Sequence, residues 1–309
     1  MAYNLKSIKK EFSEKGIFYT PVELANYLKS FLPENVDEVY DPTCGDGGLL
    51  CVFGDDVKKY GQELNEEQLI VAQNRLVNFE GVCGDTLANP AFKGRKFKAI
   101  IANPPFGIKW NPPKMDLIDN DERFAECPVM PPAGQADFAF ILHILHYLSD
   151  DGVAIVMDST SILWRDKAQG EIRKWFIENN YIDTVVYIPG DQFVDTKIKT
   201  CLWILKKNKS NTDIKFINKE TSEEKIFTFE QIKKNNFNLH ERFYFPEEKI
   251  EDTTTINDIH FQMLEDTKGM LRAVIELSRS FSEMGLSILF DDFIHDVEEI
   301  IKDAKRSNK

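Results

Sequence analysis

Short runs of apolar residues alternate with longer segments of helical periodicity through about residue 207. This alternation is typical of parallel strands joined by helices that cover both faces of the sheet. The runs predict seven strands, at residues 38–40, 58–62, 81–82, 99–102, 153–157, 184–188 and 200–205. The last two runs lie close together in the sequence, so they predict an antiparallel pair at one edge of an otherwise parallel sheet.

Four segments between these runs carry apolar residues at the spacing of one helix face. They predict helices at residues 21–31, 65–78, 137–148 and 168–179. Residues 106–135 break both patterns with prolines and charges, and they predict a long loop of the kind that closes over a site or moves. Apolar positions recur at helical spacing beyond residue 250 and predict one or two amphipathic helices. We therefore expect a main domain over residues 1–250 and a helical segment over residues 251–309.

The composition limits the class of protein. A chain of 309 residues with 42% hydrophobic and 29% charged residues can form one large core and a smaller appendage. No apolar run has the length needed to cross a bilayer, and the first residues lack the apolar stretch of a signal peptide, so we expect a cytoplasmic protein with no membrane contact. Five scattered cysteines are typical of free thiols in a reducing compartment.

The net charge of -13 is unfavourable for a protein that binds nucleic acid, because contacts to phosphates supply much of that affinity. Residues 241–309 carry 16 acidic and 9 basic side chains, a net of -7, so more than half of the excess lies there. Lysine clusters at residues 6–10, 93–98, 197–199 and 206–209 would allow a local positive surface, although each cluster alone is more typical of a solvated face.

Two histidines, His143 and His146, share the predicted helix at residues 137–148 and could in principle bind a metal ion. No third ligand lies near them in the sequence. The pattern therefore favours an ordinary helical pair and no metal site.

A glycine-rich turn follows the first predicted strand, in the sequence Asp41-Pro42-Thr43-Cys44-Gly45-Asp46-Gly47-Gly48. Glycines let the backbone turn sharply and approach a ligand closely, and Asp41 at the strand end can accept hydrogen bonds from a ligand amine. The turn alone does not distinguish a dinucleotide from an adenosyl group.

Acidic residues follow the next two predicted strands. Glu63, in Gly61-Gln62-Glu63-Leu64, comes 22 residues after Asp41, at the place where an acid binds ribose hydroxyls. Asp85, in Cys83-Gly84-Asp85-Thr86, can accept a hydrogen bond from an adenine amino group. Either acid alone is more typical of a strand-end cap, but at matching places after successive strands they favour an adenosyl ligand.

The sequence Asn103-Pro104-Pro105-Phe106 follows the fourth predicted strand. Two prolines end the strand and stiffen the chain, so Asn103 and the Pro104 carbonyl are held at the carboxyl edge of the sheet, where ligands bind. An amino group on an aromatic base is a poor nucleophile because its lone pair is delocalised. These two acceptors would favour a tetrahedral nitrogen that points at a sulfonium methyl group, and Phe106 would stack on a base flipped out of the duplex.

Together these residues resemble the N6-adenine DNA methyltransferases, most closely the modification subunits of type I restriction systems, over about residues 16–245. The resemblance implies an α/β class I AdoMet-dependent methyltransferase fold with a Rossmann-like seven-stranded sheet. It also implies S-adenosyl-L-methionine as the cofactor and methyl transfer to N6 of adenine in double-stranded DNA. The cofactor contacts that it implies are Phe18, Tyr19, Thr20, Asp41, Thr43, Cys44, Gly45, Gly47, Glu63, Leu64, Asp85, Thr86 and Asn103.

The resemblance also assigns the catalytic residues. These are Asn103, Pro104, Pro105 and Phe106, together with Phe193, whose ring would cover the other face of the flipped base. Asp46 stands where the family usually has a small serine, which places an added negative charge near the cofactor.

Two departures from the family bear on the partners. Only some fifteen residues precede the Phe18-Tyr19-Thr20-Pro21 box, where the family has a helical domain, and no large target-recognition domain follows. We therefore expect a separate specificity subunit to read the DNA sequence, with the C-terminal helices as a docking element for it or as a contact between copies of the chain.

Other readings of the motif remain. Enzymes that methylate the side-chain amide of glutamine in proteins, and some that methylate RNA amino groups, share the Asn-Pro-Pro sequence, although the glutamine enzymes usually have tyrosine at the place of Phe106 and lack the Phe-Tyr-Thr-Pro box. A non-catalytic subunit with this fold is a further alternative, as is a plain nucleotide-binding module. A plain nucleotide-binding module would leave the Asn103 segment without a function.

Overall fold

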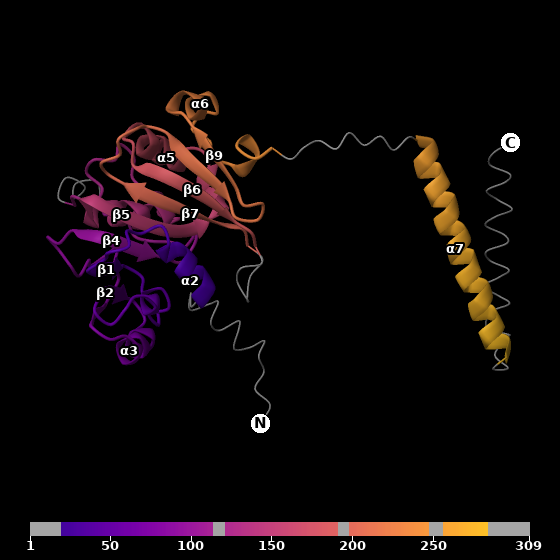
Figure 1. The fold of residues 1–309 in the computed structure, drawn as a ribbon, viewed down its shortest axis with the longest axis horizontal. Coiled ribbons are helices and arrows are strands. Elements are labelled where there is room, and N and C mark those ends of the chain that lie inside the picture. The colour runs from indigo at the N-terminus through magenta and orange to yellow at the C-terminus, as the bar shows by residue number, and fades with distance from the viewer. Residues whose placement is uncertain (1–19, 114–120, 191–197, 247–255, 284–309) are drawn as a thin grey trace. The chain divides into compact units, whose positions relative to one another are not determined.

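The structure is a computed structural model that describes residues 20–113, 121–190, 198–246 and 256–283 (Figure 1). It divides into two units, residues 1–247 and residues 248–309. Phe18, Tyr19 and Phe193, three of the predicted site residues, lie outside the described residues.

One sheet organises the first unit. Its nine strands are β1 (Glu38–Asp41), β2 (Lys58–Glu63), β3 (Phe79–Cys83), β4 (Phe97–Ala102), β5 (Leu148–Ser159), β6 (Ile182–Ile188), β7 (Thr200–Lys206), β8 (Ile214–Asn218) and β9 (Glu223–Phe227). Their order in the sheet is β3-β2-β1-β4-β5-β7-β6-β8-β9. Strands β1 to β5 pair in parallel, whereas β7 lies between β5 and β6 and is antiparallel to both. The predicted α/β architecture with a mostly parallel sheet is confirmed.

The predicted number of strands and the predicted edge are wrong. The antiparallel pair β6 and β7 is internal, because β8 pairs in parallel with β6, and β9 pairs with β8 and forms the edge. Strand β8 is five residues long and carries the charged Lys215 among buried positions, and β9 begins with three consecutive charged residues; Lys215 forms an ion pair with Glu224 of β9 at 2.9 Å. The sequence signal is therefore short in β8 and mostly polar in β9, as expected for a strand at a solvated edge.

The predicted helices are present with shorter ends. They are α2 (Val22–Lys29), α3 (Glu66–Arg75), α4 (Asp137–Tyr147) and α5 (Ala168–Glu178). Helix α3 ends three residues before the predicted end because Leu76 is extended and Asn78 takes a positive φ of 55° on the way into β3. A short helix that was not predicted, α6 (Phe229–Lys234), begins with a capping box between Thr228 and Gln231.

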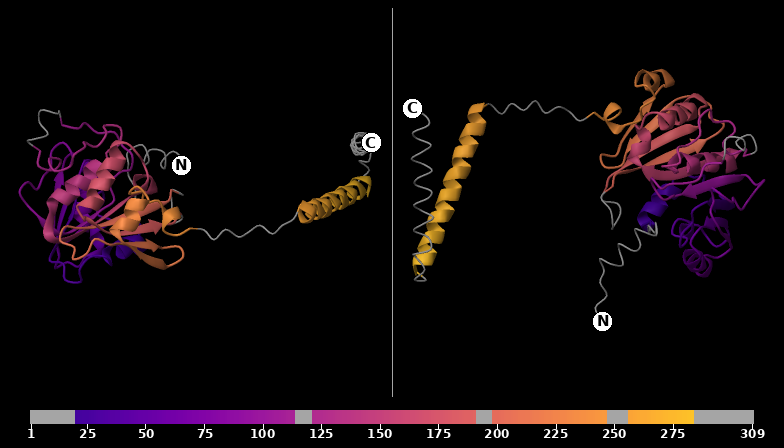
Figure 2. Two further views of the ribbon diagram at one scale, coloured as in Figure 1. Left: turned by 90° about the horizontal axis from the view of Figure 1, so that it is seen from above. Right: turned by 180° about the vertical axis from the view of Figure 1, so that it is seen from behind.

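The sheet separates two apolar layers, as its alternating side chains require. On β5, Ala154 and Val156 pack into a layer with α4 and α5. Ile155 and Met157 face the opposite layer, which contains residues of α2 and α3. Figures 1 and 2 show α2 and α5 on opposite faces of the sheet. The loops that follow β1 and β4 contribute to these layers as well, for example Leu49 to the layer with α2 and Trp110 to the layer with α4.

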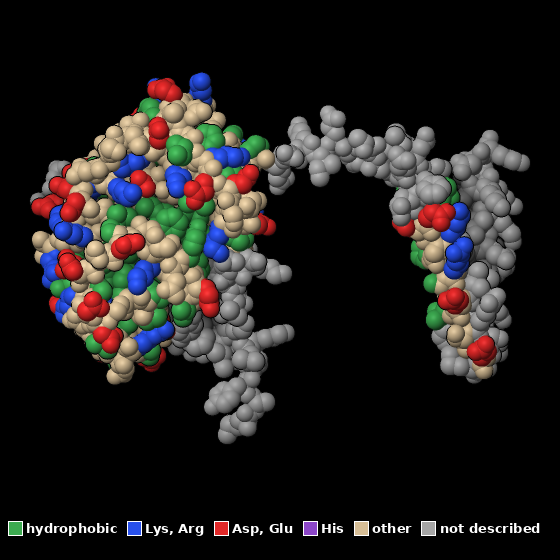
Figure 3. Space-filling model, viewed as in Figure 1, with side chains coloured by type: hydrophobic (Ala, Val, Ile, Leu, Met, Phe, Trp, Pro, Cys, Tyr) green, Lys and Arg blue, Asp and Glu red, His purple; other side chains and the backbone are tan. Residues whose placement is uncertain are grey.

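On the face shown in Figure 3, hydrophobic side chains gather in a shallow hollow in the middle of the first unit. Around it, lysine and arginine side chains alternate with acidic ones, so this face carries no continuous positive surface.

The described part of the second unit is helix α7 (Ile256–Glu283). Its apolar residues Met263, Met270 and Leu277 recur every seven residues, and 52% to 67% of each is exposed within the structure. This confirms a helix in the C-terminal segment. Among the helices of the described residues, none is long and apolar enough to cross a membrane.

Candidate active site

The parallel strands bring four predicted loops to one edge of the sheet. Asp41 ends β1 and Glu63 ends β2, while Asp85 follows β3 and Asn103 follows β4. Because β1 pairs in parallel with both β2 and β4, and β2 with β3, the carboxyl ends of all four strands meet there. Ligands of open α/β sheets bind at this edge.

The glycine-rich turn is held by the end of β2. Glu63 accepts hydrogen bonds from the main-chain N–H groups of Gly45, at 2.9 Å, and of Asn65, at 2.8 Å. The N–H of Cys44 donates to the carbonyl of Gln62 at 3.0 Å. Gly45 and Gly47 have positive φ angles of 54° and 81°, which other residues rarely adopt. No described atom outside the turn lies within 4 Å of a Cβ built on Gly45, so the backbone there is open to a ligand.

Asp41 is buried, with 1% of its surface exposed. Its carboxylate accepts a hydrogen bond from the Thr43 N–H at 2.9 Å. Burial raises the pKa of Asp41 to about 7; the Thr43 N–H lowers the pKa, and the nearby Glu63 charge raises it. A buried carboxylate with few partners can accept further hydrogen bonds from a ligand at low desolvation cost.

The loop after β3 is tied to the loop after β1. The Thr86 hydroxyl donates to the Pro42 carbonyl. Asp85 accepts hydrogen bonds from the N–H groups of Leu87, at 2.8 Å, and Ala88, at 3.1 Å. Asp85 therefore also caps the turn in which it lies. This is the structural role that the sequence predicted as the alternative to adenine binding. Leu64 is 69% exposed next to Glu63.

Asn103 contacts a residue 83 positions earlier in the chain. Its side-chain Nδ2 donates to the Thr20 hydroxyl at 3.2 Å, and Thr20 belongs to the Phe-Tyr-Thr-Pro box. This bond uses the amide nitrogen and leaves the side-chain oxygen to act as an acceptor. Of the residues that follow, Pro104 is buried, Pro105 is half-buried, and Phe106 is half-buried against the layer that contains α2. Thr20 of the box and Asn103 of the motif are therefore in direct contact.

Sequence reasoning missed Asp137, the first residue of α4. Asp137 is 1% exposed, and its Oδ1 accepts a hydrogen bond from the Gly107 N–H at 2.9 Å. The next residue, Ile108, accepts through its carbonyl from the Ala136 N–H at 2.8 Å. The segment directly after Phe106 is thus fixed to the start of α4. The available signal was an acid at the start of a helix that is otherwise almost entirely apolar.

The negative charge of Asp46 is paired within the protein. Its Oδ2 lies 2.8 Å from Nη1 of Arg75 on α3, and its Oδ1 accepts from the Gly48 N–H at 3.0 Å. Asp46 is therefore directed toward α3, and the added charge that the sequence placed near the cofactor is balanced by Arg75.

The two histidines of α4 have different surroundings. His143 is fully buried between the Tyr40 hydroxyl, at 3.1 Å, and Nη1 of Arg123, at 3.3 Å. Burial and the Arg123 charge hold the pKa of His143 well below its usual range, so the ring is neutral and part of a hydrogen-bonded core network.

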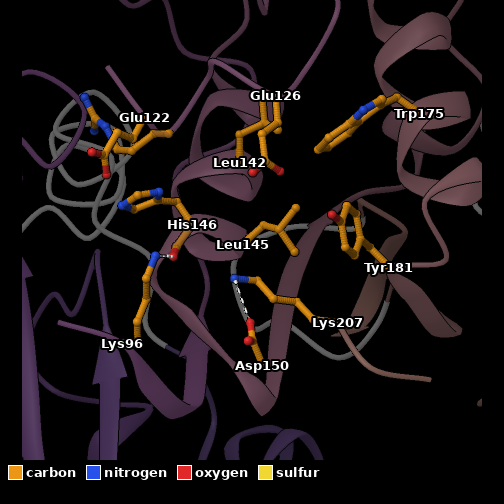
Figure 4. A pocket seen from close by; sticks show the side chains of 11 residues that line it. Lys96, Glu122, Glu126, Leu142, Leu145, His146, Asp150, Trp175, Tyr181 and Lys207 are labelled. Atoms are coloured by element: carbon orange, nitrogen blue, oxygen red, sulfur yellow. Dashed lines mark hydrogen bonds and ion pairs between the residues drawn. The ribbon is translucent and has the colours of Figure 1, made fainter. Parts of the chain in front are cut away.

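His146 lines a separate cavity of about 210 Å³ (Figure 4). The cavity lies near the amino ends of the parallel strands, because Lys96 precedes β4, Asp150 belongs to the start of β5, and Tyr181 precedes β6. In Figure 4, Trp175 and Tyr181 face His146 and Lys96 across it. None of the predicted site residues that the structure describes lines this cavity. It is therefore distinct from the carboxyl edge where those residues meet.

Comparisons with known proteins agree with this geometry. Residues 3–252 match the sequence model of the family described as N-6 DNA Methylase. The chain is 30% identical over 247 residues to the type I restriction enzyme MpnII methylase subunit of Mycoplasma pneumoniae, an alignment that covers 72% of this chain and 45% of the relative. The chain therefore spans about half the length of the curated relatives that it matches.

Solved structures are similar in fold. The methyltransferase subunit of a type I restriction-modification system from Streptococcus thermophilus superimposes with a TM-score of 0.66 at 29% identity, over 72% of this chain and 58% of that one. A Listeria monocytogenes protein described as a class I S-adenosylmethionine-dependent methyltransferase superimposes with a TM-score of 0.52 at 19% identity, over 65% of each chain. The second likeness supports the fold alone, and the predicted class I fold is confirmed.

Proposed function

Because the chain belongs to the N-6 DNA methylase family, we propose that it transfers a methyl group from S-adenosylmethionine to N6 of adenine in DNA, as the modification subunit of a type I restriction-modification system. The observation that carries this proposal is the contact between Asn103 and Thr20, which joins the residues expected to act on the base to the box expected to contact the cofactor. Both lie at the carboxyl edge of a sheet of the matching fold.

The residues at the glycine-rich turn fit an adenosyl cofactor. Gly45 leaves its backbone open, and Asp41 offers a buried acceptor for an amine. Glu63 keeps acceptor capacity for ribose hydroxyls while it fixes the turn, since each carboxylate oxygen can accept more than one hydrogen bond. When bound, S-adenosylmethionine supplies an electrophilic methyl group on a sulfonium.

The Asn103 segment would act on the other substrate. The side-chain oxygen of Asn103 and the Pro104 carbonyl would accept the two hydrogens of the adenine amino group and so favour a tetrahedral nitrogen. Phe106 would stack on the flipped base, and Phe193, outside the described residues, is the proposed second ring. Asp137 would keep this segment in place through Gly107.

The C-terminal helix would connect the chain to its partners. Helix α7 exposes apolar residues at a seven-residue spacing, which is the pattern of a helix that packs against another helix. We propose that it docks a separate specificity subunit that reads the DNA sequence, with a second copy of the chain as the alternative occupant.

The test is methylation of DNA by the purified chain alone and in the presence of a type I specificity subunit from the same organism. Transfer of a labelled methyl group to DNA, RNA and protein would be measured side by side. The proposal expects strong, sequence-specific transfer to adenine N6 in DNA only when the partner is present. Transfer to RNA or to protein glutamine instead of DNA would contradict the substrate, and strong specific transfer by the chain alone would contradict the separate specificity subunit.

Cofactor binding is expected to depend on pH through Asp41. Only the ionised carboxylate pairs well with a ligand amine, and a group with a pKa of about 7 is mostly protonated at pH 6. The affinity for S-adenosylmethionine should therefore rise about eightfold between pH 6 and pH 7.5, as the ionised fraction rises. Isothermal titration calorimetry would measure this rise. The Asp41→Asn variant should bind with an affinity that changes little over the same range, and an equal slope in both proteins would exclude Asp41 as the cause.

The pairing of Asp46 with Arg75 predicts a second effect on the cofactor site. Arg75→Gln leaves the Asp46 carboxylate without its cation beside the glycine-rich turn, and a partly exposed ion pair of this kind contributes at most about 1 kcal/mol. We expect the affinity for S-adenosylmethionine to fall by about two- to fivefold. The double variant Asp46→Ser/Arg75→Gln should recover most of this loss. Equal affinities in the single and double variants would show that the charge of Asp46 has no influence.

A further inference from the structure

Two buried carboxyl groups lie behind the segment that follows Phe106. They belong to Asp137, at the start of α4, and Asp158, near the end of β5, and each is 1% exposed. Oδ1 of Asp137 accepts from the Gly107 N–H at 2.9 Å, and Oδ1 of Asp158 accepts from the Ser159 N–H at 2.6 Å. One oxygen of each carboxyl group is therefore used by the main chain.

The second oxygens lack a donor. Oδ2 of Asp137 and Oδ2 of Asp158 are both buried, and neither accepts a hydrogen bond from any N–H or O–H of the described residues. The cation of Arg165 lies 3.9 Å from Oδ2 of Asp137, which is within ion-pair range but too far for a hydrogen bond. If both carboxyl groups were ionised, they would lower the free energy of unfolding, because burial disfavours charge, like charges repel, and each group would keep an oxygen without a hydrogen bond.

One proton between the two groups removes most of this cost. Burial raises the pKa of Asp158 well above its usual range; the charge and the close approach of the Asp137 side chain raise the pKa further, while the Ser159 N–H opposes the rise. The other groups that face the pair are Arg165 and Cys201, the neighbour of Asp158 on β7. Burial also raises the pKa of the Cys201 thiol well above its usual range, so the thiol stays neutral. One negative charge then remains on the carboxyl pair, opposite Arg165.

We propose that Asp158 and Asp137 share one proton, donated from Oδ2 of Asp158 to Oδ2 of Asp137, and that this carboxyl pair is a positioning device for the Asn103-Pro104-Pro105-Phe106 loop. The bond fixes the orientation of the Asp137 carboxylate, so its Oδ1 stays directed at Gly107. The pair thereby links the end of β5 to the residue directly after the loop. Its role in methyl transfer rests on the proposed function, whereas its role in holding Gly107 does not.

Replacing the carboxyl groups by amides tests the shared proton. Each Oδ1 already accepts a main-chain hydrogen bond, so only one hydrogen is needed between the two Oδ2 positions, and an amide NH₂ group can supply it. In Asp158→Asn, Nδ2 replaces the O–H donor to Asp137. In Asp137→Asn, Oδ1 still accepts from Gly107, and Nδ2 donates to an ionised Asp158. Either single variant should lower the methyl-transfer rate by less than about threefold. In the double variant two NH₂ groups face each other, and the rate should fall by more than about tenfold, since buried polar groups are left without acceptors.

Stability gives a readout that does not require methyl transfer. In the native protein the folded chain keeps a proton that the unfolded chain releases above the ordinary pKa of aspartate, so the free energy of unfolding should fall as pH rises from about 5 to 8. Asp158→Asn should reduce this slope by the contribution of one proton, while the contribution of Asp41, whose pKa is raised to about 7, should remain. Asp151→Asn, an exposed position on the same strand, should keep both the slope and the rate.

Hydrogen exchange at the Gly107 amide completes the test. The native protein and both single amide variants should protect this amide, and the double variant should expose it at least about tenfold more. Three outcomes would each overturn the shared proton. The single variants could lower the rate and the protection as much as the double variant does, or the double variant could retain the native rate and protection. The third outcome is an unchanged pH slope in Asp158→Asn. If the proposed function were wrong, the stability slope and the exchange pattern would still appear without any methyl transfer to DNA.

Discussion

Methyl transfer to DNA is expected to fall by about a thousandfold when Asn103 is replaced by alanine, the size of effect seen when one preorganised polar group is removed from a reacting centre. The oxygen of Asn103 is the side-chain acceptor proposed for the adenine amino group, and no other side chain of Asn103-Pro104-Pro105-Phe106 can accept a hydrogen bond. Binding of S-adenosylmethionine should change by less than about tenfold, because Asn103 contributes at most one neutral hydrogen bond there. Single-turnover rates and calorimetry would separate the two effects.

Two control variants separate the acceptor from the structural role of Asn103. Asn103→Asp keeps an acceptor oxygen but loses the donor to Thr20, so it should retain more activity than Asn103→Ala. Thr20→Val removes the hydroxyl that Asn103 contacts but leaves the acceptor, and it should lower the rate by about tenfold or less. A Thr20→Val variant as inactive as Asn103→Ala would show that Asn103 acts mainly by holding the Thr20 segment, and would contradict the proposed role.

The sequence predicted the parallel part of the fold because each of its buried strands is a short, nearly continuous apolar run, such as Ala99–Ala102 in β4. It did not predict β8, which is only five residues long and includes the charged Lys215, or β9, which begins with three charged residues. The placement of β7 between β5 and β6 depends on pairing between distant segments, and local periodicity does not contain that information.

Some residues of the candidate site could likewise be predicted from the sequence, and others could not. The positions of Asp41, Glu63, Asp85 and Asn103 could be predicted because each residue ends a strand or follows one within two residues, so the position in the chain fixes the position in space. Asp137, Asp158 and Arg75 could not, because their partners Gly107, Ser159 and Asp46 come into contact only through packing or through a local turn of the folded chain. Asp137 stands out as an acid at the start of an almost entirely apolar helix, but an acid in the first turn is also expected for the helix dipole alone, so this signal does not identify a support of the loop.

Replacing Asp41 with alanine is expected to weaken binding of S-adenosylmethionine by about ten- to a hundredfold, since a hydrogen bond to a charged group contributes about 1.5–3 kcal/mol. Asp41 ends β1 at the base of the glycine-rich turn, and its buried carboxylate has one short hydrogen bond, from the Thr43 N–H. The remaining acceptor capacity is what a ligand amine would use. Equilibrium binding measured by calorimetry at pH 7.5 would determine the loss.

The stability of the same variant decides whether that loss is specific. The pKa of Asp41 is raised from 3.8 to about 7 in the folded protein, so the free energy of unfolding falls as pH rises through this interval and the loss is complete at pH 8; removing the carboxyl group should therefore not lower the melting temperature at pH 8. Weaker binding together with an equal or higher melting temperature would place Asp41 in the cofactor site at the expense of stability, as is common for groups that bind ligands. A large fall in melting temperature would instead assign Asp41 to the support of the turn, and unchanged binding would remove it from the site.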